Sequence, residues 1–202
     1  MARSLRFPEV LVGSVRFPES KTSEAGLRAY PFTMRLRWDI PDLDAFIEDP
    51  RHTVTVTGRI VCEPLGGDLP VANGLVELFA VDAGRVVMNY LLRFDADNGQ
   101  RLELRGAKQI VHDRAKDLWP DTTTLPVEIR QTTGDQRLVV AGQVRLTLPR
   151  VMQAIITMRA PGTARVKIGT ILAFDRFFVA ELAHVYLAAV RPTDRRRSSA
   201  GS

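Results

Sequence analysis

The stretch that decides the fold is Met88–Leu125, which reads MNYLLRFDADNGQRLELRGAKQIVHDRAKDLWPDTTTL. In its first part, apolar residues recur at every second position and polar residues fill many of the positions between them. The apolar residues of one parity are Met88, Tyr90, Leu92 and Phe94. This period of two is typical of a β-strand with one buried face and one solvated face.

A tight turn and a second strand follow. Asp97-Asn98-Gly99 contains the Asn-Gly pair, which tolerates the positive φ of a type I′ turn and is the strongest hairpin signal in the chain. After the turn, Leu102 and Leu104 continue an apolar phase, with Arg101, Glu103 and Arg105 in the other phase. The stretch therefore predicts an antiparallel hairpin.

Lys108 falls in the apolar phase of the second strand, and His112 does so too if the strand runs that far. Two interpretations are open because Gly106 precedes them, and a glycine inside a strand often marks a bulge that reverses the parity beyond it. With a bulge, Lys108 points to solvent. Without one, Lys108 lies in an apolar cavity and needs a partner. Asp113 and Asp117 are the nearby candidates.

The rest of the chain repeats the alternating pattern in short segments. Strands are expected in Leu11–Phe17, Thr33–Ile40, Thr53–Cys62, Gly74–Val81, Leu125–Arg130 and Leu138–Leu148. Pro64–Pro70 is expected to be a loop, and 42–49 a short helix between two prolines. After Pro149 the apolar spacing changes to that of a helix, although a strand over Ile155–Arg159 also fits.

Thr170–Val190 is expected to be one long helix with an apolar face. Asp175, Arg176, Glu181 and His184 lie within it, and charged groups are costly in hydrocarbon, which argues against a transmembrane span. We expect this helix to cover the barrel or to form an interface, such as a homodimer contact.

Taken together, the pattern predicts a mainly β fold, because antiparallel sheets with one wet face alternate in this way and βαβ units do not. We expect a closed antiparallel barrel of about eight strands, lipocalin-like in architecture, with a short helix near 42–49 and a long C-terminal amphipathic helix. A two-sheet β-sandwich is the alternative. The expected organisation is an N-terminal arm with a first strand (1–31), one barrel domain (32–190) and a basic disordered tail (191–202).

Composition narrows the function classes. The chain has 202 residues, a formal net charge of +5 and one cysteine. Cys62 therefore has no disulfide partner within the chain, fits a reducing compartment and lies in an apolar phase as a small core residue. No secretory signal is recognisable, so we expect a cytoplasmic protein. The basic surface allows contact with anionic lipid headgroups or an acidic partner, and the sequence lacks the motifs of a nucleic-acid reader.

Signatures of catalysis are absent from the sequence. It has no Gly-rich phosphate loop, no G-x-S-x-G elbow and no H-E-x-x-H motif. His52, His112 and His184 are far apart and lack metal-ligand spacing, so we expect no metal or cofactor and structural roles for the histidines. Asp113, Asp117 and Asp121 near His112 are the carboxylates able to orient a base or raise its pKa.

The loop Asp117–Leu125 is unusually dense in Asp, Trp and Thr. Asp and Thr satisfy backbone donors in turns, and Trp119 can plug a barrel end, which is the structural interpretation. In the functional interpretation, Trp119 joins Tyr90 and Lys108 at the mouth of an apolar pocket. The candidate ligand-binding residues are Tyr90, Lys108, His112, Asp117, Trp119 and Thr123.

The pattern M-x-Y-x-L-x-F, a short turn, L-x-G-x-K and then D-L-W-x-D-T-T-T-L resembles a segment that accompanies the flavin domain in long cholesterol-oxidase-like glucose-methanol-choline oxidoreductases. The matching positions are Met88, Tyr90, Leu92, Phe94, Leu104, Gly106, Lys108, Asp117, Leu118, Trp119, Asp121, Thr122, Thr123, Thr124 and Leu125. Leu43–His52 and the late helix are also similar. This chain has no G-x-G-x-x-G motif, so flavin chemistry is not carried over. The resemblance implies a stand-alone accessory domain that works beside sterol or lipid metabolism.

Three hypotheses about function follow. The first is a non-catalytic barrel that holds a sterol-like or fatty-acyl-like ligand, or presents it to a partner oxidoreductase. The second is a barrel enzyme of isomerase or cyclase type, with Lys108, Tyr90 or His112 as acid-base groups. The third is a protein-interaction domain with a filled core.

Overall fold

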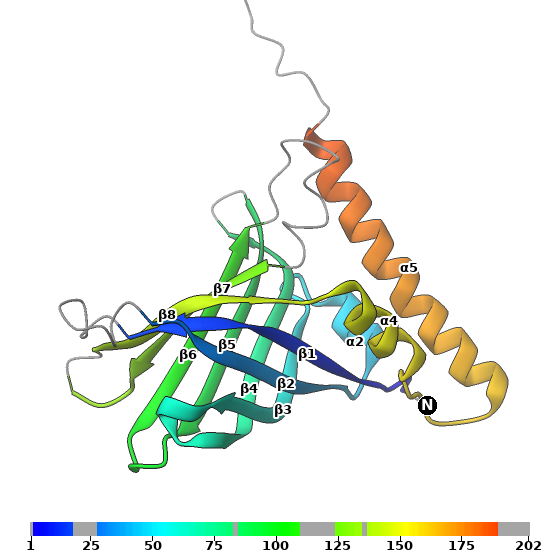
Figure 1. Cartoon of the computed structure of the whole chain (residues 1–202). Helices are drawn as coiled ribbons and strands as arrows, with labels where there is room; N and C mark the ends of the chain where they lie inside the picture. Colours follow the sequence, from blue (N-terminus) through cyan, green and yellow to red (C-terminus); the bar gives the residue numbers. More distant parts are fainter. Residues whose placement is uncertain (1, 18–27, 83–84, 110–123, 135–136, 190–202) are drawn as a thin grey trace, which may run out of the picture.

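A computed structural model describes residues 2–17, 28–82, 85–109, 124–134 and 137–189. Eight antiparallel strands close into a barrel in which each strand pairs with the next along the chain and the first pairs with the last (Figure 1). The strands are β1 (Leu5–Arg16), β2 (Tyr30–Ile40), β3 (Thr53–Cys62), β4 (Gly67–Asp82), β5 (Arg85–Asp95), β6 (Arg101–Gln109), β7 (Thr124–Gln131) and β8 (Leu138–Arg145). The predicted eight-stranded barrel is confirmed, and the sandwich alternative is wrong.

In the part of the chain that the structure describes, three α-helices and one 3₁₀ turn accompany the barrel. They are α2 (Leu43–Glu48), η2 (Glu63–Leu65), α4 (Leu148–Ile156) and α5 (Ala164–Ala189). The short helix α2 begins where the Asp42 carboxylate accepts hydrogen bonds from the backbone N–H groups of Asp44 and Ala45. The three α-helices gather at one end of the barrel, with α5 outermost (Figure 1). The short helix and the long C-terminal helix were both predicted, although α5 begins at Ala164 rather than at Thr170.

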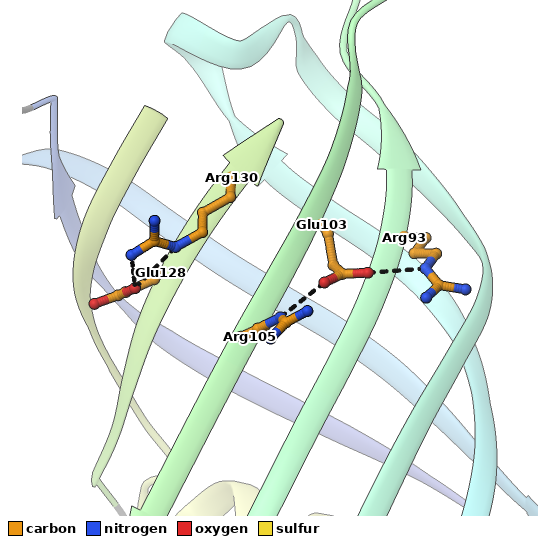
Figure 2. A network of polar contacts seen from close by, with 5 residues as sticks. All are labelled: Arg93, Glu103, Arg105, Glu128 and Arg130. Carbon is orange, nitrogen blue, oxygen red and sulfur yellow. Dashed lines mark hydrogen bonds and ion pairs between the residues drawn. The ribbon is translucent and has the colours of Figure 1, made fainter. Parts of the chain in front are cut away.

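The barrel interior is filled by the predicted apolar phases. Met34, Leu36, Trp38 and Ile40 of β2 are all buried, as are Leu92 of β5 and Leu104 of β6. Arginine and acidic residues occupy the outward phase, where they form ion pairs across and along the strands. On the outer face of β5, β6 and β7, Arg93 and Arg105 both bond Glu103, and Arg130 bonds Glu128 (Figure 2). The arginines of these pairs are exposed to solvent, so the pairs add little to stability.

The barrel closes where β1 meets β8. Val12–Arg16 pairs with Ala141–Arg145, and a glycine lies on each side of this seam. A side-chain carbon added at Gly13 or at Gly142 would collide with the backbone of the opposite strand. The two strands therefore approach each other as closely as they do because neither position carries a side chain.

Two boundaries expected from the sequence differ in the structure. The first strand, expected over Leu11–Phe17 in the N-terminal arm, is β1, which already begins at Leu5 and pairs with both β2 and β8. The closed barrel includes this strand. The loop expected over Pro64–Pro70 is mostly strand, because Gly66 and Gly67 take positive φ after a single 3₁₀ turn and β4 begins at Gly67.

The turn between β5 and β6 differs from the predicted type I′ turn. Gly99 has a φ of 76°, and among the described non-glycine residues only His52 and Phe79 have positive φ. The Gly99 N–H donates to the carbonyl of Ala96, and the Gln100 N–H donates to the Asn98 side chain. Asn98 thus stabilises the turn through its side chain instead of adopting a left-handed backbone, as in longer hairpin loops that end in a left-handed glycine.

Candidate functional site

A cavity of about 170 Å³ lies between the barrel and the helices α4 and α5. Its apolar lining comes from both, and includes Phe7, Leu11, Trp38, Leu78, Met88, Leu125, Leu146, Ala154, Met158, Phe174 and Phe178. Four polar side chains also reach it: Glu9, Tyr90, Lys108 and Asp175. The cavity is therefore apolar with a few convergent polar groups, which is the usual composition of a small-molecule site.

Strand parity explains why these polar groups point inward. Glu9 belongs to the phase of β1 that also contains the buried residues Leu5, Leu11 and Val15. An acidic residue in this phase is carried into the barrel by the same alternation that buries its neighbours. Tyr90 occupies the corresponding inward phase of β5, between Met88 and Leu92.

β6 has no bulge at Gly106, and Lys108 therefore points into the barrel. The pairing of β5 with β6 runs without a register shift from Asp95↔Arg101 through Tyr90↔Gly106 to Val87↔Gln109. Gly106 is required for a different reason: a Cβ at this position would lie 2.9 Å from the Leu125 side chain, which packs over the glycine. Lys108 keeps the inward phase and is only 8% exposed.

The Glu9 carboxylate is the centre of a buried hydrogen-bond cluster. The Trp38 indole donates to Glu9 Oε2 over 3.0 Å, and the Tyr90 hydroxyl donates to Glu9 Oε1 over 3.1 Å. These three residues come from β1, β2 and β5, so the cluster forms only when the barrel is closed. A buried carboxylate that accepts two such bonds is held in one position.

The charges in the cavity act on one another. Burial raises the pKa of the Glu9 carboxyl, while the two hydrogen bonds and the positive charge of Lys108 lower it. Burial and the charge of Glu9 raise the pKa of the Tyr90 phenol well above its ordinary value, so Tyr90 keeps its proton. Burial also raises the pKa of Asp175 on α5. The cavity thus combines a carboxyl group with a raised pKa (Glu9), a protonated phenol (Tyr90) and a cation (Lys108).

The structure brings together two of the six predicted site residues. Tyr90 and Lys108 both line the cavity, whereas His112, Asp117, Trp119 and Thr123 lie outside the described residues. Sequence reasoning missed Glu9 as a site residue. The signal was present, because Leu5, Phe7, Glu9 and Leu11 share one parity and an acid in an apolar phase must find a partner.

Trp38 was predicted to face inward but not to belong to the site. Its role follows from the pairing of β1 with β2, which brings its indole N–H beside Glu9. No feature of the β2 sequence indicates this pairing, since the two residues meet only through the register of β1 with β2, where Trp38 is opposite Phe7.

The other reactive side chains have structural surroundings. His52 is buried against Phe46 and Phe177, and its Nδ1 lies 2.9 Å from the Phe46 carbonyl oxygen. Cys62 is buried, and burial raises the pKa of its thiol to about 11. Cys62 is thus a core residue rather than a nucleophile. His184 is exposed on α5.

Within the described ranges, no three His, Cys, Asp or Glu side chains are arranged to hold a metal ion. In the same part of the chain, no helix is both long enough and apolar enough to span a membrane.

No family model, curated protein or solved structure matches the chain. The resemblance of Met88–Leu125 to a segment of cholesterol-oxidase-like proteins therefore stays a prediction. Any function must be inferred from the cavity itself.

Proposed function

We propose that this barrel binds an apolar ligand of sterol-like or fatty-acyl-like character. The ligand carries one polar group, which binds at the Glu9–Lys108 end of the cavity. The observation that carries the proposal is the convergence of Glu9, Tyr90 and Lys108 inside an otherwise apolar cavity. Burying polar groups costs free energy, so their presence in the cavity favours a role in orienting a ligand. The resemblance to cholesterol-oxidase-like proteins supports a sterol-like ligand over a fatty-acyl-like one.

The polar groups favour a ligand that carries a hydroxyl over one that carries a carboxylate. A hydroxyl can donate to the Glu9 carboxylate and accept from the Lys108 ammonium at the same time. A ligand carboxylate would be attracted by Lys108 but would meet the charge of Glu9 in surroundings that screen it poorly. A neutral alcohol such as a sterol avoids this repulsion.

The size of the cavity limits how the ligand is held. At about 170 Å³, the cavity is smaller than the roughly 300–1,000 Å³ of typical ligand pockets. It therefore accommodates the polar end of a sterol or acyl ligand, and the remainder must displace side chains of the wall. Phe174 and Phe178 of α5 form part of that wall, so binding a full-length ligand requires α5 to shift on the barrel.

Native mass spectrometry with added cholesterol and added palmitate tests the proposal. We expect a one-to-one cholesterol adduct and weaker binding of palmitate. Lys108→Met should weaken cholesterol binding about ten- to a hundredfold through the loss of one charged hydrogen bond. Arg105→Met is the matched control, because Arg105 lies on the same strand but points outward. The control should bind as the wild type does.

Two results would contradict parts of the proposal separately. If neither cholesterol nor palmitate forms an adduct at any concentration tested, the binding function is wrong, and the third hypothesis, an interaction domain, gains support. If palmitate binds and cholesterol does not, the barrel is a lipid binder but the preference for a hydroxyl is wrong.

A second candidate function is acid-base catalysis, because a buried carboxyl with a raised pKa inside a cavity is a common arrangement for a general acid or base. Glu9 would then move a proton on a bound ligand, with Tyr90 donating to a developing oxyanion. Incubation with a steroid ketone in D₂O should introduce deuterium next to the carbonyl, and Glu9→Gln should abolish it. An unlabelled ketone would rule out this candidate without affecting the binding proposal.

A further inference from the structure

Apolar contacts hold α5 against the barrel end. Ring contacts from this helix to the rest of the protein are made by Phe174, Phe177 and Phe178. Thr170 is also buried, but its hydroxyl donates to the Val166 carbonyl oxygen of the same helix over 2.9 Å. From residue 164 to residue 181, the described salt bridges and side-chain hydrogen bonds include none to another element. This part of α5 can therefore leave the barrel without breaking a side-chain hydrogen bond or ion pair.

Phe177 fits among three aromatic rings at the barrel end. Its ring centroid lies 5.6 Å from that of Phe46 in α2, 4.7 Å from that of His52 and 6.3 Å from that of Phe79 in β4, each time edge to face. The His52 ring is fixed in turn, because its Nδ1 lies 2.9 Å from the Phe46 carbonyl oxygen. Edge-to-face contacts at these separations stabilise aromatic pairs. We call Phe46, His52 and Phe79 the aromatic site.

Two residues of the aromatic site have an unfavourable backbone conformation. His52 has a φ of 45° and Phe79 a φ of 56°, and they are the two non-glycine residues with positive φ among those described. Phe79 also lies at the register shift between Glu77 and Ala80 in the pairing of β4 with β5, and such an irregularity re-aims a side chain. Strained positions of this kind occur at ligand clamps and switch regions. Both rings contact Phe177, which favours a role for the strain in docking α5.

Two neighbouring phenylalanines of the same helix close the cavity. Phe174 and Phe178 both belong to its wall. The Phe174 ring lies 5.4 Å from Phe7, which stacks on Trp38 at 5.2 Å, and the Trp38 indole donates to Glu9. The docked position of α5 thus completes the wall beside the polar cluster.

The three residues that precede α5 are suited to act as a hinge. Just before them, Arg159 and Arg6 exchange two backbone hydrogen bonds of 2.8 and 2.9 Å, which fix the connection to β1. Pro161, Gly162 and Thr163 are then all exposed, and Gly162 has a φ of 108°. Hinges of moving segments are a few loop residues of this kind, next to a fixed point.

We propose that α5 is a lid over the cavity, hinged at residues 161–163 and held closed by Phe177 in the aromatic site. The inference rests on the proposed binding function, because the lid serves to admit a ligand larger than the closed cavity. When Phe177 leaves the aromatic site, Phe174 and Phe178 leave the cavity wall with it, since all three belong to one helix. Apolar burial alone then sets how often the lid opens.

Thiol labelling tests the lid in the absence of a ligand. Met88→Cys places a thiol in the cavity wall, at a position that is 6% exposed, and the buried Cys62 reports unfolding of the whole barrel. In low urea, the introduced thiol should react with iodoacetamide faster than Cys62 and with a weaker dependence on urea, because opening of a lid exposes little surface. Mass spectrometry of the digested protein measures both rates.

Phe177 is the residue to change, because it holds α5 in place without lining the cavity. Phe177→Ala in the Met88→Cys background should raise the labelling rate of the introduced thiol at least about a hundredfold. Phe177→Leu should raise it about tenfold and carries the test if the alanine variant does not fold. Leu172→Ala is the matched control, since it shortens an apolar side chain of α5 that is 54% exposed. It should leave the rate unchanged.

Three results would overturn the lid. The first is an introduced thiol that reacts no faster than Cys62 and with the same dependence on urea, because the cavity would then be reached only by unfolding. The second is a thiol that reacts as fast as in the unfolded protein, because the cavity would then be open without any movement. The third is a labelling rate that Phe177→Ala and Phe177→Leu leave unchanged.

The association rate of the fluorescent sterol dehydroergosterol tests whether the lid is the entrance. If α5 must open first, Phe177→Ala should raise this rate by about the same factor as the labelling rate. An unchanged association rate in a variant that labels faster would overturn the role of α5 in ligand entry. Absence of sterol binding in every variant would contradict the proposed function instead, and the labelling rates would still decide whether α5 opens.

Discussion

Removing the charge of Lys108 is the sharpest test of the polar cluster inside the barrel. In Lys108→Met, the side chain keeps its apolar stem but loses the ammonium, whose charge lowers the pKa of Glu9. Glu9 keeps the hydrogen bonds from Trp38 and Tyr90. Its carboxyl must then either stay charged in apolar surroundings without this cation or bind a proton. Both responses reduce the free energy of unfolding at neutral pH.

The free energy needed to keep Glu9 protonated sets the upper limit of this loss. The ordinary pKa of the carboxyl is 4.5, and each pH unit above it costs about 1.4 kcal/mol. The upper limit is therefore about 1 kcal/mol at pH 5 and about 5 kcal/mol at pH 8. The measured deficit must be smaller, because burial already raises the pKa of Glu9 in the wild-type protein.

The direction of the pH dependence follows from the raised pKa of Glu9. A carboxyl whose pKa is higher in the folded state stabilises the fold below its unfolded pKa, and this contribution is lost as the pH rises through the folded value. Lys108→Met raises the pKa of Glu9 in the folded state further. The deficit of the variant relative to the wild type should thus grow from pH 5 to pH 8.

Urea unfolding followed by circular dichroism at pH 5 and pH 8 measures this deficit. Arg105→Met is the control, since it removes a charge on the outer face of the same strand. In Glu9→Gln/Lys108→Met, neither group titrates, so the pH-dependent part of the deficit should disappear. A deficit for Lys108→Met that is equal at the two pH values, or below about 0.5 kcal/mol at both, would refute the coupling of Lys108 to Glu9.

Three further predictions concern single residues. Tyr90→Phe removes the 3.1 Å hydrogen bond to buried Glu9 and should lower the free energy of unfolding by about 1–3 kcal/mol in urea titrations. Gly106→Val places atoms where Leu125 packs, with the first carbon 2.9 Å from that side chain, and should cost about 1–3 kcal/mol in the same assay. Cys62, with its pKa raised to about 11, should react with iodoacetamide at pH 8 at least about a hundredfold more slowly in the native protein than in urea.

The barrel was predictable because alternation is a local property of the chain. Each inward phase, such as Met34 to Ile40, can be recognised without knowing the neighbouring strand, and eight such segments with short connections leave few architectures. The boundaries were less predictable. β1 begins at Leu5 despite Pro8 and Glu9, because pairing with β2 from Leu5 onward stabilises a strand that its own sequence indicates only weakly.

The candidate site was only half predictable, for a reason that concerns register. The positions of Tyr90 and Lys108 followed from parity once Gly106 proved to sit in regular pairing. The meeting of Glu9 with Trp38 and Tyr90 depends on which residues of three strands lie at the same height in the barrel. A single strand carries no information about that height, and two-residue periodicity is the same for every register.

The seam between β1 and β8 has a consequence for how the protein is made. The strand synthesised first can find its second partner only after the strand synthesised last has left the ribosome, and contacts so distant in sequence slow folding. Until then, Glu9 belongs to a strand whose ring is open, and water can reach its carboxyl. Glu9 becomes buried when β1 pairs with β8, and the same pairing removes the free edges of the sheet. A chain that stops before β8 would lack more than a strand: it would expose two unpaired edges, a hazard for aggregation, and a cavity without a closed wall.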